Sequence, residues 1–457
     1  MELKKINENI FREYDVRGIY GSDLDIDVAY TFGRSFATYI SKMGNTEVIV
    51  GHDNRESSPE LSEGLIKGLM ESGASVTDLG LVTTPMYYFA KLKNKIETGI
   101  MITASHNPRE YNGFKISFSI DGNACGKAIT DFRDFTNKLE FISKEGTYRS
   151  IDIKNEYLNE VKNSVDIGNR KVKVVYDCGN GTGSIIVKEM LDMFNIEYDL
   201  LYCDSDPTFP NHHPDPCVEA NLEALKKKVI ETHSDIGVGF DGDGDRVGVI
   251  SNTGKFIPMD HYLILMIKDM FNRVEPKKFL YDVKCSKAVQ DVIDELGGEG
   301  ECYRTGNSYT RARVYELHLP VGAELSGHVY FNDHFLGFDS GLYAGLRIIE
   351  LLSRCNKTVD ELVSDIPKYY STDEIKIHAD DSIKFEIVSK IEEYVKEKEY
   401  KYLTIDGIKV LFDDGFALLR ASNTGPNLTL RFEAKTEDRL EEISKEFTEL
   451  VEKLLNK

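Results

Sequence analysis

The sequence predicts an α/β protein of four domains, the first three with similar mixed α/β sandwich cores and the last a smaller α+β domain. At 457 residues the chain is too long for one core, because domains hold roughly 150 residues. Three successive segments each repeat apolar strands that end in polar loops, whereas strands and long amphipathic helices alternate in the last part. The predicted domains are residues 1–150, 151–252, 253–366 and 367–457.

The first segment reads as alternating helices and strands. A helix is expected from about 27 to 42 and a strand at 47–50, and Ser58 and Pro59 then begin a second helix that Gly73 ends. A strand, a helix and a further strand in this order favour a parallel sheet.

That further strand, at 99–102, leads directly into Thr103-Ala104-Ser105-His106-Asn107-Pro108. Pro108 stops regular structure, so Ser105 lies at a strand end, and loops at the carboxyl ends of parallel strands border the crevice in which ligands bind. Residues 111–115 re-enter a strand and aim Lys115 back towards Ser105. Ser105 is a candidate nucleophile, although an ordinary polar turn also accounts for these residues taken alone.

The second and third segments restart the same pattern, with polar loops directly after apolar strands. The pairs of strand and loop are 171–177 with Gly179–Gly183, 235–240 with Asp241–Arg246, 279–283 with Lys284–Ser286, and 319–321 with Gly322–His328.

The last segment follows residues 364–368, which read as a linker because Pro367 separates a helix from a different pattern. The elements predicted beyond it are strands at 403–412, 416–421 and 428–434 and helices at about 382–396 and 437–455.

Charge and composition exclude several classes of protein. The formal net charge is -21, and a protein that binds a nucleic-acid backbone needs a basic face. No run of about 18 apolar residues predicts a membrane span. The 7 cysteines include no C-x-x-C pair, which argues against a disulfide framework or a zinc site. We expect a reduced, cytoplasmic enzyme with no nucleic-acid or membrane partner.

Three carboxylates, Asp241, Asp243 and Asp245, alternate with glycines. At this spacing they repel one another, and a divalent cation that prefers oxygen ligands relieves the repulsion. A calcium-binding EF-hand does not fit, because its sixth and twelfth positions are Arg246 and Asn252 here instead of Gly and Glu. The pattern favours Mg²⁺; a solvated acidic turn is the alternative.

A second polar loop, Arg420-Ala421-Ser422-Asn423-Thr424-Gly425-Pro426, follows a predicted strand of the last domain. A guanidinium fork, hydroxyls, an amide and a glycine turn with free backbone N–H groups suit a dianionic phosphate. A capped turn is the alternative.

Taken together, these elements give the chain a resemblance to the bacterial phosphomannomutases/phosphoglucomutases of the α-D-phosphohexomutase family, over nearly its whole length. The motifs that carry it, in the family's order, are Tyr14-Asp15-Val16-Arg17-Gly18, Thr103-Ala104-Ser105-His106-Asn107-Pro108, Tyr111-Asn112-Gly113-Phe114-Lys115, Asp241-Gly242-Asp243-Gly244-Asp245-Arg246, Asp282-Val283-Lys284-Cys285-Ser286, Glu324-Leu325-Ser326-Gly327-His328 and Arg420-Ala421-Ser422-Asn423-Thr424.

The resemblance implies an isomerase that interconverts hexose 6-phosphate and hexose 1-phosphate, of mannose, glucose or both. Ser105 then acts as a phosphoserine, and a hexose 1,6-bisphosphate forms, reorients and returns its other phosphate. The implied cofactor is Mg²⁺, with the bisphosphate as activator. The implied partners are sugar phosphates, for a monomer or a small homo-oligomer.

The match of motifs also implies roles for single residues. Mg²⁺ is held by Asp241, Asp243, Asp245 and the phosphate on Ser105. The implied catalytic residues are Ser105, Arg17, Lys115, Arg246 and His328. Lys115, near other cations, is expected to have a lowered pKa for proton transfer, and His328 matches a proposed general base, a plain loop histidine being the alternative. Substrate contacts fall to Tyr14, Lys284, Glu324, Ser326, Arg420, Ser422, Asn423 and Thr424, of which Glu324 and Ser326 hold sugar hydroxyls and the last four hold the phosphate that is not transferred.

Two positions bear on specificity. Asn307 stands where the family often has a histidine, and an amide cannot titrate near neutral pH. Leu325 is apolar, whereas relatives specialised for glucosamine phosphate carry Gln there and glucose-only relatives commonly Glu, so it favours mannose and glucose phosphates.

The alternatives are a phosphoglucosamine mutase and a Mg²⁺-dependent sugar phosphatase, although a phosphatase has no need of the Arg420 loop. A mutase makes a geometric prediction. Loops from the first three domains should converge on Ser105 around a central cleft, with the Arg420 loop one sugar phosphate away.

Overall fold

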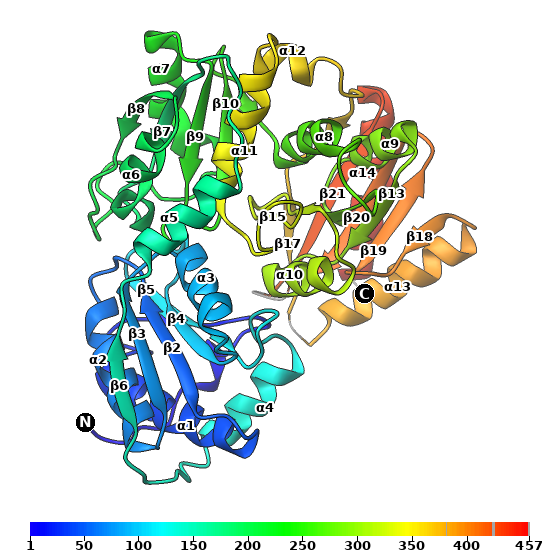
Figure 1. The fold of residues 1–457 in the computed structure, drawn as a ribbon. Coiled ribbons are helices and arrows are strands. Elements are labelled where there is room, and N and C mark those ends of the chain that lie inside the picture. The colour runs from blue at the N-terminus through cyan, green and yellow to red at the C-terminus, as the bar shows by residue number, and fades with distance from the viewer. Residues whose placement is uncertain (381, 423–425, 456–457) are drawn as a thin grey trace.

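The computed structural model describes residues 1–380, 382–422 and 426–455. Within these residues the strands form four sheets, one after another along the chain (Figure 1). The predicted order of three mixed α/β units and a smaller last one is confirmed. The exact domain boundaries stay predictions.

The first unit has a sheet in the order β1-β5-β4-β2-β3-β6, in which β4, β2, β3 and β6 pair in parallel and β5 runs antiparallel to both of its neighbours. Its elements are β1 (Val16–Ile19), α1 (Ile26–Lys42), β2 (Glu47–His52), α2 (Ser58–Glu71), β3 (Ser75–Leu81), α3 (Thr84–Asn94), β4 (Gly99–Ile102), β5 (Tyr111–Ser117), α4 (Lys127–Thr136) and β6 (Thr147–Ser150), after a short 3₁₀ turn at Glu8–Ile10. Helices α1 and α2 approach closely because Gly33 and Gly68 lack a side chain; a Cβ on either would lie 2.2 Å or 2.1 Å from a carbonyl oxygen of the other helix. Ser58 does not cap α2, since its hydroxyl donates to Asp53 Oδ1 at 2.6 Å.

The second and third units repeat this arrangement with sheets in the orders β11-β10-β9-β7-β8 and β13-β12-β14-β15. The elements of the second are α5 (Lys154–Asn163), β7 (Lys173–Asp177), a 3₁₀ turn (Thr182–Ile185), α6 (Val187–Asp192), β8 (Glu197–Leu201), a 3₁₀ turn (Glu219–Leu222), α7 (Glu223–Thr232), β9 (Ile236–Phe240), β10 (Val247–Ser251) and β11 (Phe256–Ile257). Those of the third are α8 (Met259–Met270), β12 (Lys278–Asp282), α9 (Lys287–Leu296), β13 (Glu299–Tyr303), α10 (Asn307–Glu316), β14 (Val321–Ala323), β15 (Val329–Phe331), α11 (Gly341–Arg354) and α12 (Val359–Val363).

One cluster of apolar side chains joins the first three units, and further clusters lie within each unit alone. A single cluster of buried side chains runs from Ile49 and α3 through the second sheet to α8, α9 and α11. Helix α11 is buried on every side and packs on β9 and β10. It comes from the predicted third domain yet covers the sheet of the second, so the second and third units are packed together through a continuous apolar core.

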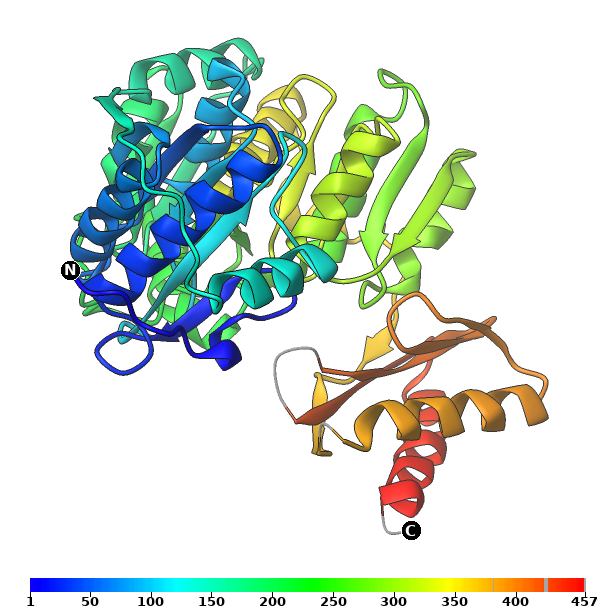
Figure 2. The same ribbon diagram turned by 90° about the horizontal axis from the view of Figure 1, so that it is seen from below.

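The last unit has its own apolar core, and both faces of its sheet are covered by apolar contacts. Its elements are β16 (Tyr370–Ser371), β17 (Ile375–His378), α13 (Lys384–Glu397), β18 (Lys401–Leu403), β19 (Ile408–Phe412), β20 (Gly415–Ala421), β21 (Asn427–Ala434) and α14 (Glu437–Leu455). Along β20, Ala417 and Leu419 face the helices, whereas Phe416 and Leu418 pack on Val283 of the third unit. Figure 2 shows both helices on the side of this sheet away from the rest.

One predicted strand of this unit is wrong. In place of one strand over 403–412, β18 ends at Leu403 and β19 begins at Ile408, because the chain turns at Gly407, whose φ of +81° suits glycine. Within the described residues, no helix is both long enough and apolar enough for a lipid bilayer.

Candidate active site

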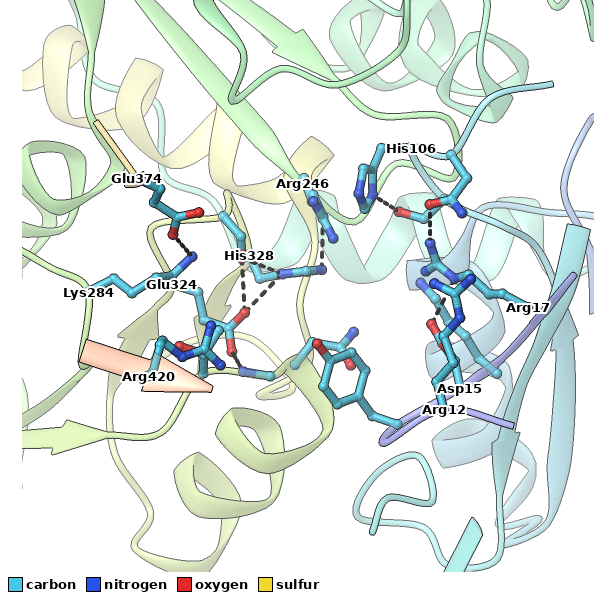
Figure 3. A pocket seen from close by; sticks show the side chains of 18 residues that line it. Arg12, Asp15, Arg17, His106, Arg246, Lys284, Glu324, His328, Glu374 and Arg420 are labelled. Atoms are coloured by element: carbon cyan, nitrogen blue, oxygen red, sulfur yellow. Dashed lines mark hydrogen bonds and ion pairs between the residues drawn. The ribbon is translucent and has the colours of Figure 1, made fainter. Parts of the chain in front are cut away.

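A cavity of about 380 Å³ lies where loops of all four units meet (Figure 3). His106, Arg17 and Arg12 lie on one side of it, Lys284, Glu374 and Arg420 on the other, and Arg246 and His328 between them. The described residues that line it are Arg12, Tyr14, Asp15, Arg17, Ser105, His106, Asn107, Lys115, Arg246, Lys284, Thr305, Gly306, Asn307, Glu324, Ser326, His328, Glu374 and Arg420. The predicted convergence on a central cleft is therefore present in the geometry.

Ser105 follows β4 in a strained backbone conformation, with φ +51° at a residue that has a side chain. Its N–H donates to Thr103 Oγ1 at 2.8 Å, and its hydroxyl donates to Asp241 Oδ2 at 2.7 Å. The buried guanidinium of Arg55 donates to the carbonyl of Ser105 at 2.8 Å and fixes the loop from behind. These bonds turn the hydroxyl towards the acidic loop of the second unit.

His106 lies beside this hydroxyl, with its Nδ1 3.2 Å from Ser105 Oγ. Burial and the charges of Arg246 and Arg17 lower the pKa of His106 well below its usual value. The ring next to the candidate nucleophile is therefore neutral.

The acidic loop between β9 and β10 is held by its own backbone. Asp241 Oδ1 accepts hydrogen bonds from the N–H groups of Gly244, Asp245 and Arg246, each at 3.1 Å. A Cβ on Gly242 would lie 2.5 Å from the carbonyl oxygen of Ser105, so only glycine lets the two loops come this close.

The expectation of a lowered pKa at Lys115 is wrong. Burial disfavours its charged form, but its Nζ lies 2.7 Å from Asp243 Oδ2 and 2.5 Å from Asp245 Oδ2, and these carboxylates raise the pKa of Lys115 well above its usual value. Its nearest partners are acids, not the cations that the motif comparison placed around it.

The three aspartates fit a divalent cation. Each has a carboxylate oxygen within 4.8 Å of the other two, and all three side chains are buried. Asp243 Oδ1 and Asp245 Oδ1 are buried without a hydrogen-bond partner in the described part of the chain. Burial and the charges of Asp245 and Asp243 raise the pKa of Asp241 well above its usual value, whereas Lys115 outweighs burial and lowers the pKa of Asp243 and Asp245.

Arg246, His328 and Glu324 connect the second and third units. Arg246 Nε lies 3.3 Å from His328 Nε2, and His328 Nδ1 lies 3.2 Å from both Glu324 Oε2 and Ser326 Oγ. Burial and Arg246 oppose a charge on His328, but Asp245 and Glu324 outweigh them and raise its pKa to about 9. The ring is protonated at neutral pH in this arrangement, and a role as general base stays a prediction.

Arg17 and Tyr14 come from the segment around β1. Arg17 pairs with Asp15 at 2.8 Å and donates to Asn107 Oδ1 at 2.6 Å, which aims it at the loop of Ser105. Burial, with Asp15 and Glu324 nearby, raises the pKa of Tyr14, so it enters the cavity as a neutral phenol.

The far side of the cavity holds two cations, each already paired with a carboxylate. Lys284 Nζ lies 3.2 Å from Glu374 Oε1, and Arg420 lies 2.9 Å from Asp406 Oδ2. Burial disfavours a charged Lys284, but Asp282 and Glu374 outweigh burial and raise its pKa. An anion that binds here competes with these acids.

Some predicted contacts are not found in the cavity wall. Ser422 follows β20 and is not among the described residues that line the cavity, and Asn423 and Thr424 lie outside the described residues. Leu325 packs against the shared apolar core and is not among the described residues that line the cavity, so the specificity expected from this position stays a prediction. Asn307 lines the cavity and donates to Asp339 Oδ2 at 3.0 Å, a contact in which the amide serves as a fixed donor.

The motif comparison gave no role to several residues of the site. Arg55 follows β2 in a polar loop of the kind that singled out Ser105, so the sequence held a signal for it. No sequence pattern marks Glu374 or Asp406, because Glu374 meets Lys284, and Asp406 meets Arg420, only once the last unit has folded and packed.

Models of the phosphoglucomutase/phosphomannomutase family match the chain in four parts. They are the α/β/α domain I at residues 8–142, the α/β/α domain II at 155–254, the α/β/α domain III at 258–370 and the C-terminal domain at 374–450.

Individual proteins agree with these matches. A phosphomannomutase/phosphoglucomutase of Pseudomonas putida is 38% identical over 442 residues, 96% of this chain and 95% of its own length. A phosphoglucomutase of Neisseria meningitidis is 38% identical over 98% of both chains. A crystal structure of a phosphoglucomutase/phosphomannomutase family protein from Burkholderia thailandensis superposes with a TM-score of 0.92 at 35% identity, covering 98% of both chains. By sequence and by fold, the chain belongs to the phosphoglucomutase/phosphomannomutase family.

Proposed function

We propose that this protein interconverts hexose 6-phosphate and hexose 1-phosphate, of mannose, glucose or both, through a phosphoserine at Ser105 and a hexose 1,6-bisphosphate intermediate. The observation that carries the proposal is the layout of one cavity. A serine hydroxyl bonded to a metal-type acidic loop lies on one side, and two cations on the far side suit a second phosphate.

The residues between these ends suit a sugar. Glu324 and Ser326 line the cavity between the serine and the far cations, where a carboxylate and a hydroxyl can bond sugar hydroxyls. The charge of His328 and the hydroxyl of Thr310, at 2.6 Å, outweigh burial and hold the pKa of Glu324 at about 2, so the carboxylate accepts hydrogen bonds at neutral pH. Because phosphate-binding groups lie at both ends of the cavity, a sugar phosphate can bind in either orientation and present either of its ends to Ser105.

The chain's own groups meet the demands of phosphoryl transfer. Asp241 accepts the hydrogen bond of the Ser105 hydroxyl and so positions it for attack. Arg17 and Lys115 line the same end of the cavity and offset negative charge on the moving phosphoryl group. His328, protonated and beside the sugar site, can give a proton to the leaving hydroxyl.

Asp241, Asp243, Asp245 and a phosphate on Ser105 are the groups that would hold Mg²⁺. When bound, the ion supplies charge neutralisation at the transferring phosphoryl group. Lys115 contacts the Oδ2 atoms of Asp243 and Asp245, and the Oδ1 atoms of both carboxylates carry no hydrogen bond from the described residues and are available to hold the cation.

The test is a comparison of three substrates. Purified protein is incubated with mannose 1-phosphate, glucose 1-phosphate or glucosamine 1-phosphate, with Mg²⁺ and catalytic glucose 1,6-bisphosphate, and the 6-phosphate is followed. We expect isomerisation of the mannose and glucose compounds and little of the glucosamine compound. Release of free phosphate, or isomerisation of none of them, contradicts a mutase; preference for glucosamine 1-phosphate contradicts the specificity.

A further inference from the structure

Two cysteines outside the active site face each other across neighbouring strands. Cys178 directly follows β7 and Cys203 follows β8, two strands that pair in parallel. Their Sγ atoms are 3.0 Å apart. Among the described residues, no other two cysteines have sulfur atoms within hydrogen-bonding distance.

Backbone bonds fix the two loops that carry the sulfurs. The N–H of Cys178 donates to the carbonyl of Leu201 at 3.2 Å, and the N–H of Asn180 donates to that of Tyr202 at 2.8 Å. Tyr202 has a φ of +50°, which turns the chain so that Cys203 points back at Cys178. A disulfide has an S–S length of about 2.05 Å, so the two sulfurs need to approach by about 1 Å.

The two thiols differ in access. Cys178 is fully buried, whereas Cys203 is half-buried. Burial and the neighbouring Cys203 raise the pKa of the Cys178 thiol well above its usual value, so Cys178 does not react first. An oxidant therefore meets Cys203, and Cys178 is placed to resolve the product.

We propose that Cys178 and Cys203 form an intramolecular disulfide when the protein meets a low-molecular-weight disulfide such as oxidised glutathione. The Cys203 thiolate attacks one sulfur of the oxidant, forming a mixed disulfide and releasing one glutathione thiolate. The Cys178 sulfur then attacks the Cys203 sulfur and gives its proton to the released thiolate, and the second glutathione leaves. Two protein thiols lose two electrons and two protons, and one oxidant molecule becomes two thiols.

The bond ties together the loops that hold the first unit against the second. Asn54 Nδ2 donates to the carbonyl of Asn180 at 2.8 Å and to Ser205 Oγ at 3.0 Å, so one side chain bridges both loops. Thr182 N–H donates to the carbonyl of Gly242 at 2.8 Å, next to the acidic loop. The disulfide thus stiffens a contact close to the active site, and it does not depend on the proposed mutase activity.

The test measures mass and peptide linkage. Reduced full-length protein is incubated with oxidised glutathione, the remaining thiols are blocked, and the protein is mapped without reduction. We expect the wild type to lose two free thiols without retaining glutathione, and the peptides of Cys178 and Cys203 to be linked. A stable glutathione adduct, a different linked pair or no loss of thiols overturns the proposal.

Variants separate the two steps. Cys203→Ser should lose no thiol pair, Cys178→Ser should keep one glutathione on Cys203, and the control Cys355→Ser, at another half-buried cysteine, should behave like the wild type. Loss of the pair in Cys203→Ser contradicts the assignment. In the wild type, slower amide exchange at 178–182 after oxidation supports the stiffened contact, and unchanged exchange there contradicts it. Because the wild-type map needs no variant, the proposal stays testable if a serine variant fails to fold.

Discussion

Glu374 is predicted to weaken anion binding at the far end of the cavity. Its Oε1 lies 3.2 Å from Lys284 Nζ, in a carboxylate whose side chain is 35% exposed. A phosphate oxygen bonded to Lys284 then lies within about 6 Å of this carboxylate. At an effective dielectric constant of about 20 the repulsion of a dianion over that distance is about 5.5 kcal/mol, and at the value of bulk water it is about 1.4 kcal/mol.

Partial exposure places the effect near the lower figure, so Glu374→Gln should bind phosphate about tenfold more tightly. Titration calorimetry with inorganic phosphate at constant ionic strength measures the change. The matched control is Glu386→Gln, which removes an exposed pair with Lys390, at 2.6 Å on α13, and should leave the affinity unchanged. Unchanged or weaker phosphate binding by Glu374→Gln refutes the reasoning.

Three further predictions concern close packing and buried charge. Gly242→Ala should lower turnover about 100-fold with an unchanged circular dichroism spectrum, because its Cβ would lie 2.5 Å from the Ser105 carbonyl oxygen and displace that loop; near-normal turnover contradicts it. Arg347→Met should lower the free energy of unfolding by about 3–5 kcal/mol, because it leaves the buried carboxylates of Asp333 and Glu350, now 2.7 Å and 2.8 Å from the guanidinium, without their partner. Urea unfolding measures the change, and an unchanged urea midpoint contradicts the prediction. Burial opposes ionisation of Asp333, but Arg347 outweighs burial and lowers its pKa, so this stabilisation is complete above about pH 4 and is lost as the pH falls through the lowered value. Acid should therefore destabilise the wild type more than Arg347→Met, and equal pH profiles would show that the pair does not titrate this way.

The part of the site that can be predicted from the sequence is the set of loops at strand ends. An apolar run followed by a polar loop marks the carboxyl end of a strand, and this pattern located Ser105, the aspartates, Lys284 and Glu324. The pattern of apolar residues likewise predicts both helices and the strands β20 and β21 of the last unit, but it gives no sign of the short strands β16 and β17. It missed the turn at Gly407, because the residues on both sides of the turn remain strand-like.

Ion pairs between residues of different units could not be predicted from the sequence. The charge state of Lys115 depends on which groups lie within 3 Å of its Nζ, and these are carboxylates of another unit, Asp243 and Asp245. Glu374 reaches Lys284 only because the last unit packs on the third through β20. Such contacts follow from domain packing, which periodicity does not encode.

The central claim is that Ser105 carries the phosphate. Protein treated with phosphatase is incubated with glucose 1,6-bisphosphate and Mg²⁺, and then analysed by intact mass and peptide mapping. The account predicts the gain of one phosphoryl group, located on Ser105, and no gain in Ser105→Ala. Phosphate on another residue, or isomerisation by Ser105→Ala at the wild-type rate, would contradict it.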